Sequence, residues 1–153
     1  MPHDFKAFPE LTNSQMQFYY FDSPHKQIFE SFTAQVANVH DGDTISVRWN
    51  ERDFVFPVRF SNIAAPETGG KKGLQAGGTA SREWLSNLLM GKTIDVVVDP
   101  ANRVEKWGRL LGRVYLSGVD VGNESILLGH SVAWNDRNQG QIIDPIGEVG
   151  KWL

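Results

Sequence analysis

Hydrophobic and polar side chains alternate over residues 43–49 and again over residues 54–63. A period of two residues is typical of strands that bury one face. Pro57 lies inside the second run and has no amide hydrogen to donate, so this strand should form an edge or carry a bulge there. The same kind of pattern predicts three more strands, over residues 27–39, 93–98 and 109–116.

The period becomes helical after residue 79 and ends near Gly91, a residue type that commonly terminates helices. The hydrophobic residues of one face are Ala80, Trp84, Leu85, Leu88 and Leu89, and we expect Trp84 to lie in the core. A short helix is also predicted over residues 122–128. The chain is therefore expected to form strands first, with a helix between the third and fourth strands.

The N-terminal region has a different composition. Residues 1–15 show no period and are interpreted as an arm, whereas residues 17–21, QFYYF, are aromatic and typical of a strand. Asp22, Ser23 and Pro24 follow, which is favourable turn chemistry. We therefore predict an aromatic hairpin between residues 17–21 and the strand that starts at residue 27.

Composition excludes several classes of protein. The 153 residues include no cysteine, so disulfides and thiolate zinc sites are excluded, and the four histidines are scattered singly. No apolar run approaches the ~20 residues of a membrane span, and the first ten residues do not resemble a signal peptide. We therefore expect no membrane partner and a location inside a cell or within an assembly. A net charge of −3 disfavours tight binding of long duplex DNA by charge alone, but a few focused cations could still hold nucleic acid.

Three strands, a helix and two further strands, in that order, are the elements of a five-stranded OB barrel, a β-rich α+β fold. Four motifs narrow the interpretation: Asp-Gly-Asp-Thr-Ile at 41–45, Val-Arg at 58–59, Ala-Pro-Glu at 65–67 and Lys-Trp-Gly-Arg at 106–109. Together, over about residues 32–134, they resemble the staphylococcal nuclease (thermonuclease-like) family. This resemblance divides the chain into an arm and hairpin at 1–31, a nuclease-like barrel at 32–134 and a tail at 135–153.

The resemblance implies a calcium-dependent phosphodiesterase that acts on DNA or RNA. Calcium binds six to eight oxygen ligands and stabilises charge on phosphoryl oxygens, while guanidinium groups offer two parallel donors to the same oxygens. The family roles would fall as follows: metal binding by Asp43 and the Ala65 carbonyl, with Asp41 behind them; water activation by Glu67; and phosphate binding by Arg59 and Arg109.

Ala64 departs from this pattern, because it stands where the family has a second metal-binding aspartate and supplies no side-chain oxygen. Affinity for calcium depends on ligand charge, so the resemblance implies weak calcium binding, or none if the loss is not compensated. Asn62 could reach inward only if its strand bends. Arg59 could also serve as a structural partner of Glu67 if no metal binds.

Further residues could contact nucleic acid: Lys71, Lys72, Lys106 and Trp107. Each has a structural alternative, since paired lysines are commonly solvated and tryptophans commonly belong to the core or its rim. Base stacking is the functional interpretation of Trp107 and, less strongly, of Trp134.

Two functions of different classes remain open. The first is a metal-dependent nuclease, the interpretation that Asp43, Arg59, Glu67 and Arg109 favour. The second is a catalytically inactive nuclease-like module, a binding or structural component of a larger assembly such as a virus particle. Ala64 and the acidic balance favour this second interpretation. In it, the N-terminal arm and the C-terminal tail would contact other protein subunits.

Overall fold

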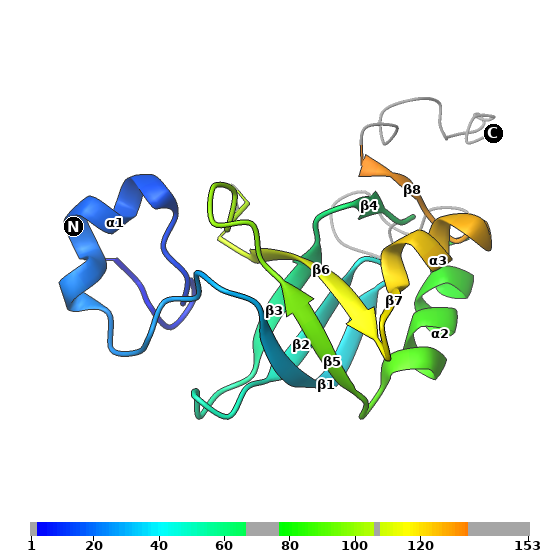
Figure 1. The fold of residues 1–153 in the computed structure, drawn as a ribbon, viewed down its shortest axis with the longest axis horizontal. Helices are drawn as coiled ribbons and strands as arrows, with labels where there is room; N and C mark the ends of the chain where they lie inside the picture. Colours follow the sequence, from blue (N-terminus) through cyan, green and yellow to red (C-terminus); the bar gives the residue numbers. More distant parts are fainter. Residues whose placement is uncertain (1–2, 67–76, 106–107, 135–153) are drawn as a thin grey trace.

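A computed structural model describes residues 3–66, 77–105 and 108–134 of the protein. Five strands form a closed barrel (Figure 1), and their bounds are β1 Phe32–Asp41, β2 Thr44–Arg48, β3 Phe56–Phe60, β5 Thr93–Val97 and β6 Leu110–Leu116. Neighbouring strands are antiparallel in the order β3-β2-β1-β5-β6, and a parallel pairing of β3 with β6 closes the barrel. The predicted five-stranded OB-type barrel is confirmed.

Smaller elements surround the barrel, and Figure 1 shows the helices α2 and α3 grouped on one side of it. Strand β4 (Ile63–Ala64) pairs with β8 (Val132–Ala133), and β7 (Val119–Asp120) extends the sheet from β6. Helix α3 (Val121–Leu127) is capped at its N-terminus by Asp120, whose carboxylate accepts a hydrogen bond from the Asn123 amide. None of the described helices has the length and hydrophobicity to span a bilayer.

Helix α2 (Gly78–Leu89) packs on β1 and confirms the helix predicted between the third and fourth barrel strands. Leu85 and Leu89 are completely buried, and Trp84 packs half-buried against the core. Ala80 was predicted on the buried face but is exposed, because the face that meets the barrel is rotated toward Ser81.

The edge predicted at Pro57 is also confirmed. Pro57 pairs with Ser46 of β2, whereas the pairing of β3 with β6 begins one residue later, at Val58. The missing amide hydrogen therefore lies where β3 has no partner in β6.

The predicted aromatic hairpin is wrong. Residues 17–21 belong to helix α1 (Asn13–Tyr19) and to the single 3-10 turn η1 (Tyr20–Asp22), and the predicted strand at 27–39 begins only at Phe32. The physical reason is a capping box, in which the Gln15 amide donates to Thr12 Oγ1 and the Thr12 amide donates to Gln15 Oε1. This local start signal outweighed the strand preference of the aromatic residues.

A buried ion cluster attaches this N-terminal arm to the barrel. We call it the Glu10 cluster, and it consists of Glu10, Arg52 from the β2–β3 turn and Arg103 from the β5–β6 connection. Arg103 donates to Glu10 Oε1 at 2.6 Å and Arg52 donates to Glu10 Oε2. Burial lowers the pKa of Arg103 below its ordinary value, while the charge of Glu10 opposes that shift. The arm is thus held by paired charges inside the fold.

Candidate functional site

The turn between β1 and β2 holds Asp43 in a fixed orientation. Its side chain is buried, and Oδ2 accepts a hydrogen bond from the Ala65 amide at 2.8 Å. Oδ1 accepts from the Thr44 hydroxyl at 3.0 Å, and the Asp43 carbonyl accepts from the Phe60 amide at 2.8 Å. Contacts from the end of β3 and from the residue after β4 therefore converge on this one aspartate.

Arg59 reaches the same carboxylate from the neighbouring strand. Its backbone is paired with Thr44 across β2 and β3, and its Nη2 lies 3.3 Å from Asp43 Oδ2. Arg59 Nη1 donates to the carbonyls of Phe60 at 2.6 Å and Ile63 at 2.9 Å. The guanidinium therefore connects the segment from Phe60 to Ile63 with Asp43, the residue just before β2.

Trp134, the last described residue of the chain, packs its ring against this arginine. Its ring centroid lies 5.1 Å from the guanidinium carbon of Arg59, and its amide donates to the Asn62 carbonyl at 3.0 Å. The residue remains 40% exposed, so one of its surfaces is open to solvent. Trp134 is thus a rim aromatic that touches the candidate site, and a role in base stacking stays a prediction.

Arg109 immediately precedes β6, the strand that pairs with the strand of Arg59. The parallel pairing places Arg59 opposite Leu111, two residues beyond Arg109, which corresponds to about 7 Å along the strand. Arg109 Nη2 donates to Glu105 Oε2 at 3.0 Å, and the Arg109 amide donates to Glu105 Oε1 at 3.2 Å. Each of the two candidate phosphate-binding arginines therefore forms an ion pair with a carboxylate of the same chain.

The sequence did not reveal how helix α2 supports this site. A Cβ atom on Gly42 would fall 1.9 Å from Ser81 Oγ and 2.9 Å from the Ala65 side chain, so only glycine fits between the two aspartates. Ser81 is completely buried, and among the described residues its hydroxyl has no hydrogen-bond partner. The only sequence signal was a glycine between Asp41 and Asp43, which also suits an ordinary turn.

The described residues do not fit a calcium site. The Asp43 carboxylate is already engaged, because both of its oxygens accept hydrogen bonds and Arg59 Nη2 lies 3.3 Å from Oδ2. Asn62 is directed toward helix α3, since its amide nitrogen donates to Asp120 Oδ1 at 3.2 Å and its amide group lies against Gly122. Within residues 3–66, 77–105 and 108–134, no three histidine or carboxylate side chains gather as a metal site would require.

Several predicted site residues lie outside the described residues, namely Glu67, Lys71, Lys72, Lys106 and Trp107. Asp41 is described: it ends β1 and is paired with Thr44 across the turn. A role for Asp41 behind a metal ion, and for the Ala65 carbonyl as a ligand, stays a prediction. The proposed pairing of Arg59 with Glu67 is likewise untested, but Arg59 does form a structural ion pair, with Asp43.

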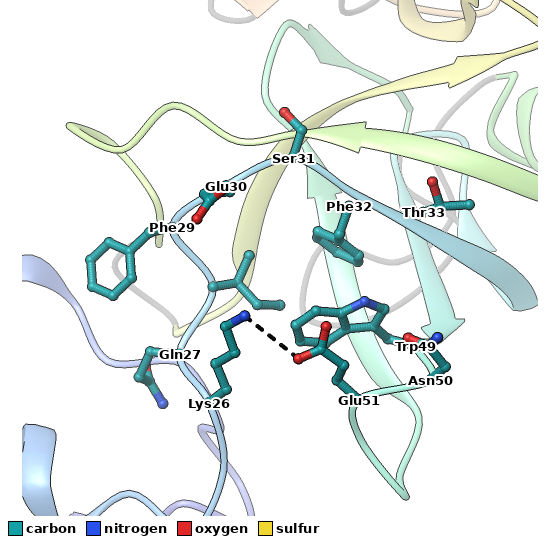
Figure 2. Close-up of a pocket in the computed structure, with 11 residues that line it drawn as sticks. Lys26, Gln27, Phe29, Glu30, Ser31, Phe32, Thr33, Trp49, Asn50 and Glu51 are labelled. Atoms are coloured by element: carbon teal, nitrogen blue, oxygen red, sulfur yellow. Dashed lines mark ion pairs between the residues drawn. The ribbon is translucent and has the colours of Figure 1, made fainter.

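A hollow of about 390 Å³ lies at the end of β2 that is opposite to Asp43 (Figure 2). Phe32 and Trp49 form an aromatic wall in it, with ring centroids 5.0 Å apart, and Lys26 Nζ lies 3.6 Å from Glu51 Oε1. Glu51 follows β2, whereas the Asp43 turn precedes that strand. The hollow is therefore separate from the candidate site.

A protein-family model described as staphylococcal nuclease homologue matches residues 57–142, more than half of the chain. The chain belongs to this family. The matched segment contains Arg59, Glu67 and Arg109, and Asp43 lies before it. The family resemblance of the motifs is thereby confirmed, and with it a nuclease-like domain.

A curated relative extends the similarity without assigning an activity. It is an uncharacterized protein of Bacillus anthracis, 28% identical over 104 residues, which span 67% of this chain and 48% of the relative. The chain therefore covers about half of that protein's length.

Proposed function

We propose that the chain is a phosphodiesterase that hydrolyses nucleic acid. The observation that carries the proposal is that Arg59, in β3 and beside Asp43, and Arg109, immediately before β6, belong to neighbouring segments of the barrel in a member of the staphylococcal nuclease homologue family. Two guanidinium groups suit the oxygens of a phosphodiester, because each can donate two parallel hydrogen bonds.

Each residue would have a distinct role in this reaction. Arg109 and Arg59 would bind the phosphoryl oxygens and stabilise the charge that develops on them, an effect worth roughly 10²–10³-fold in rate per donor. Glu67 would orient a water molecule for in-line attack and accept its proton. The nucleic-acid strand would then continue over Lys71, Lys72, Lys106 and Trp107, and over Trp134 beside Arg59.

The role of calcium is a separate part of the proposal. The family is generally calcium-dependent, but Asp43 alone offers too little oxygen and too little charge for tight binding. We therefore expect calcium to bind weakly, with any further ligands supplied by Glu67 and by the phosphodiester.

A non-catalytic binding module is the second candidate. It is favoured by Ala64, which provides no oxygen, and by the ion pair that engages Asp43 with Arg59. In this case the arm would contact other subunits of an assembly, and the exposed side chains of Phe18 and Phe21 suit such a contact. The contribution of the tail lies outside the described residues.

Cleavage assays separate the two candidates. Purified protein is incubated with single-stranded DNA and RNA, with calcium or with a chelator, beside the variants Glu67→Gln and Ala64→Asp. A nuclease should cut the native substrate, and Glu67→Gln should reduce the rate at least about 100-fold because the water loses its base. Glu30→Gln, a change of the same kind at an exposed position, should leave the rate unchanged.

If Ala64→Asp cuts nucleic acid and the native chain does not, the native site is inactive because it lacks this aspartate, while its fold is intact. If neither the native chain nor Ala64→Asp cuts, the binding module becomes the better description.

A further inference from the structure

Both arginines of the candidate site form ion pairs with acidic side chains, Arg59 of β3 with Asp43 and Arg109, just before β6, with Glu105. We infer that Asp43 and Glu105 occupy the phosphate-binding positions of Arg59 and Arg109 in the free protein, so that the site is masked by its own carboxylates. A nucleic-acid phosphate must displace them in order to bind. This inference rests on the proposed function, because it concerns the same phosphate-binding arginines.

The hydrogen bonds of Arg59 carry the first half of the inference. Its Nη1 donates to two backbone carbonyls, those of Phe60 and Ile63, so this nitrogen is directed into the fold. Its Nη2 faces Asp43 Oδ2 at 3.3 Å, and the two side chains are only 10% and 7% exposed. A phosphate oxygen that approaches Nη2 therefore meets the position of Asp43.

The second half concerns Arg109, which is more accessible. Its side chain is 34% exposed and that of Glu105 is 17% exposed, and the two groups lie 3.0 Å apart. The Glu105 amide also donates to the Arg109 carbonyl at 2.9 Å, and the Arg109 amide donates back to Glu105 Oε1. The Glu105 carboxylate is thus held by the Arg109 amide through one oxygen and occupies Nη2 of the guanidinium with the other.

A carboxylate and a phosphate present similar pairs of oxygens to a guanidinium group, which explains why one can stand in for the other. Replacing the two carboxylates with phosphates costs free energy. An incoming phosphate must break two ion pairs and then lies beside two displaced negative charges, which repel it. A single phosphate would gain too little, whereas a strand of several nucleotides adds contacts that offset the cost. The masked site therefore favours nucleic-acid strands over free phosphate.

Binding measurements without cleavage test the inference. The probe is a fluorescent single-stranded DNA oligonucleotide with phosphorothioate linkages, titrated in a chelating buffer and followed by anisotropy. Asp43→Asn and Glu105→Gln each remove a masking charge and keep the side-chain shape, so each should bind about tenfold more tightly than the native chain. Glu51→Gln removes the same charge at the hollow of Figure 2 and should change affinity less than about twofold.

The outcomes separate this inference from the proposed function. Tighter binding in either masking variant, with Glu51→Gln unchanged, supports masking even if neither the native chain nor any variant cuts nucleic acid. Unchanged or weaker binding in both masking variants overturns it, whatever the cleavage assay shows. Circular dichroism verifies folding, and Glu105→Gln decides alone if Asp43→Asn does not fold, because Glu105 lies in the connection between β5 and β6.

Discussion

The Glu10 cluster and the Asp43–Arg59 pair use the same two chemical groups, buried to different degrees. In the cluster, one carboxylate meets two guanidinium groups, and all three side chains are at most 2% exposed. In the candidate site, one carboxylate meets one guanidinium at 3.3 Å, and both side chains keep some exposure to solvent. The first arrangement joins the N-terminal arm to the barrel, and the second lies where the proposed ligand would bind.

The difference shows what burial adds to an ion pair. Removing one partner of a completely buried pair leaves an uncompensated charge that water cannot reach, and each increase in exposure makes it easier for water or a ligand to replace the lost partner. Arg52 illustrates the buried case, because its guanidinium also lies against the ring of Phe56, with 4.5 Å between carbon and ring centroid. The cluster is therefore suited to stability and the Asp43–Arg59 pair to exchange.

The largest expected effect breaks the cluster. Glu10→Gln leaves Arg52 and Arg103 buried without a counter-charge and should lower the free energy of unfolding by about 3–5 kcal/mol, measured by urea denaturation. Glu30→Gln, on the same arm but exposed, should change it by less than about 0.5 kcal/mol. Equal stability of the two variants would contradict an anchoring role for the cluster.

A smaller effect is expected beneath the candidate site. Gly42→Ala places a methyl group against Ser81 Oγ and the Ala65 side chain, and should cost about 1–3 kcal/mol of unfolding free energy. In a Ser81→Ala background the closest of these contacts is absent, so the stability should be partly restored. Ser81→Ala alone should be nearly neutral, because the hydroxyl it removes has no partner among the described residues. Additive effects of the two substitutions would argue against direct contact.

The smallest effect concerns the rim of the site. Trp134→Leu removes the ring beside Arg59 on which a base would stack and should weaken oligonucleotide binding about fivefold, since base stacking on an aromatic side chain contributes at least about 1 kcal/mol. Melting temperature should shift little. Leu127→Ala provides the control, as it truncates another exposed hydrophobic residue away from the arginine.

The barrel was predicted well from the sequence because its signals were local. Alternation at 43–49 and 54–63 and the stripe that includes Leu85 and Leu89 each follow from the geometry of a single element. Prediction was wrong at residues 17–21, where aromatic composition favoured a strand but the capping box of Thr12 and Gln15 started a helix. Two local signals competed there, and the weight given to composition was too large.

The motifs also predicted Asp43, Arg59 and Arg109 as site residues, a prediction that stays untested, but they did not predict what those side chains contact. The sequence-based alternative paired Arg59 with Glu67, whereas the described structure pairs it with Asp43 and the pairing with Glu67 is untested. Ser81 carried no signal of its own, since a buried serine on a helix looks like any other polar residue.

By itself, the sequence determined the order of strands and helix along the chain, and the family. Tertiary structure alone decided which charges meet. Glu10 and Arg103 are 93 residues apart, and Asp43 receives the amide of Ala65 from 22 residues away. Such contacts depend on how the closed barrel brings its turns together, and no local hydrophobic pattern along the chain predicts contacts between residues so far apart in sequence.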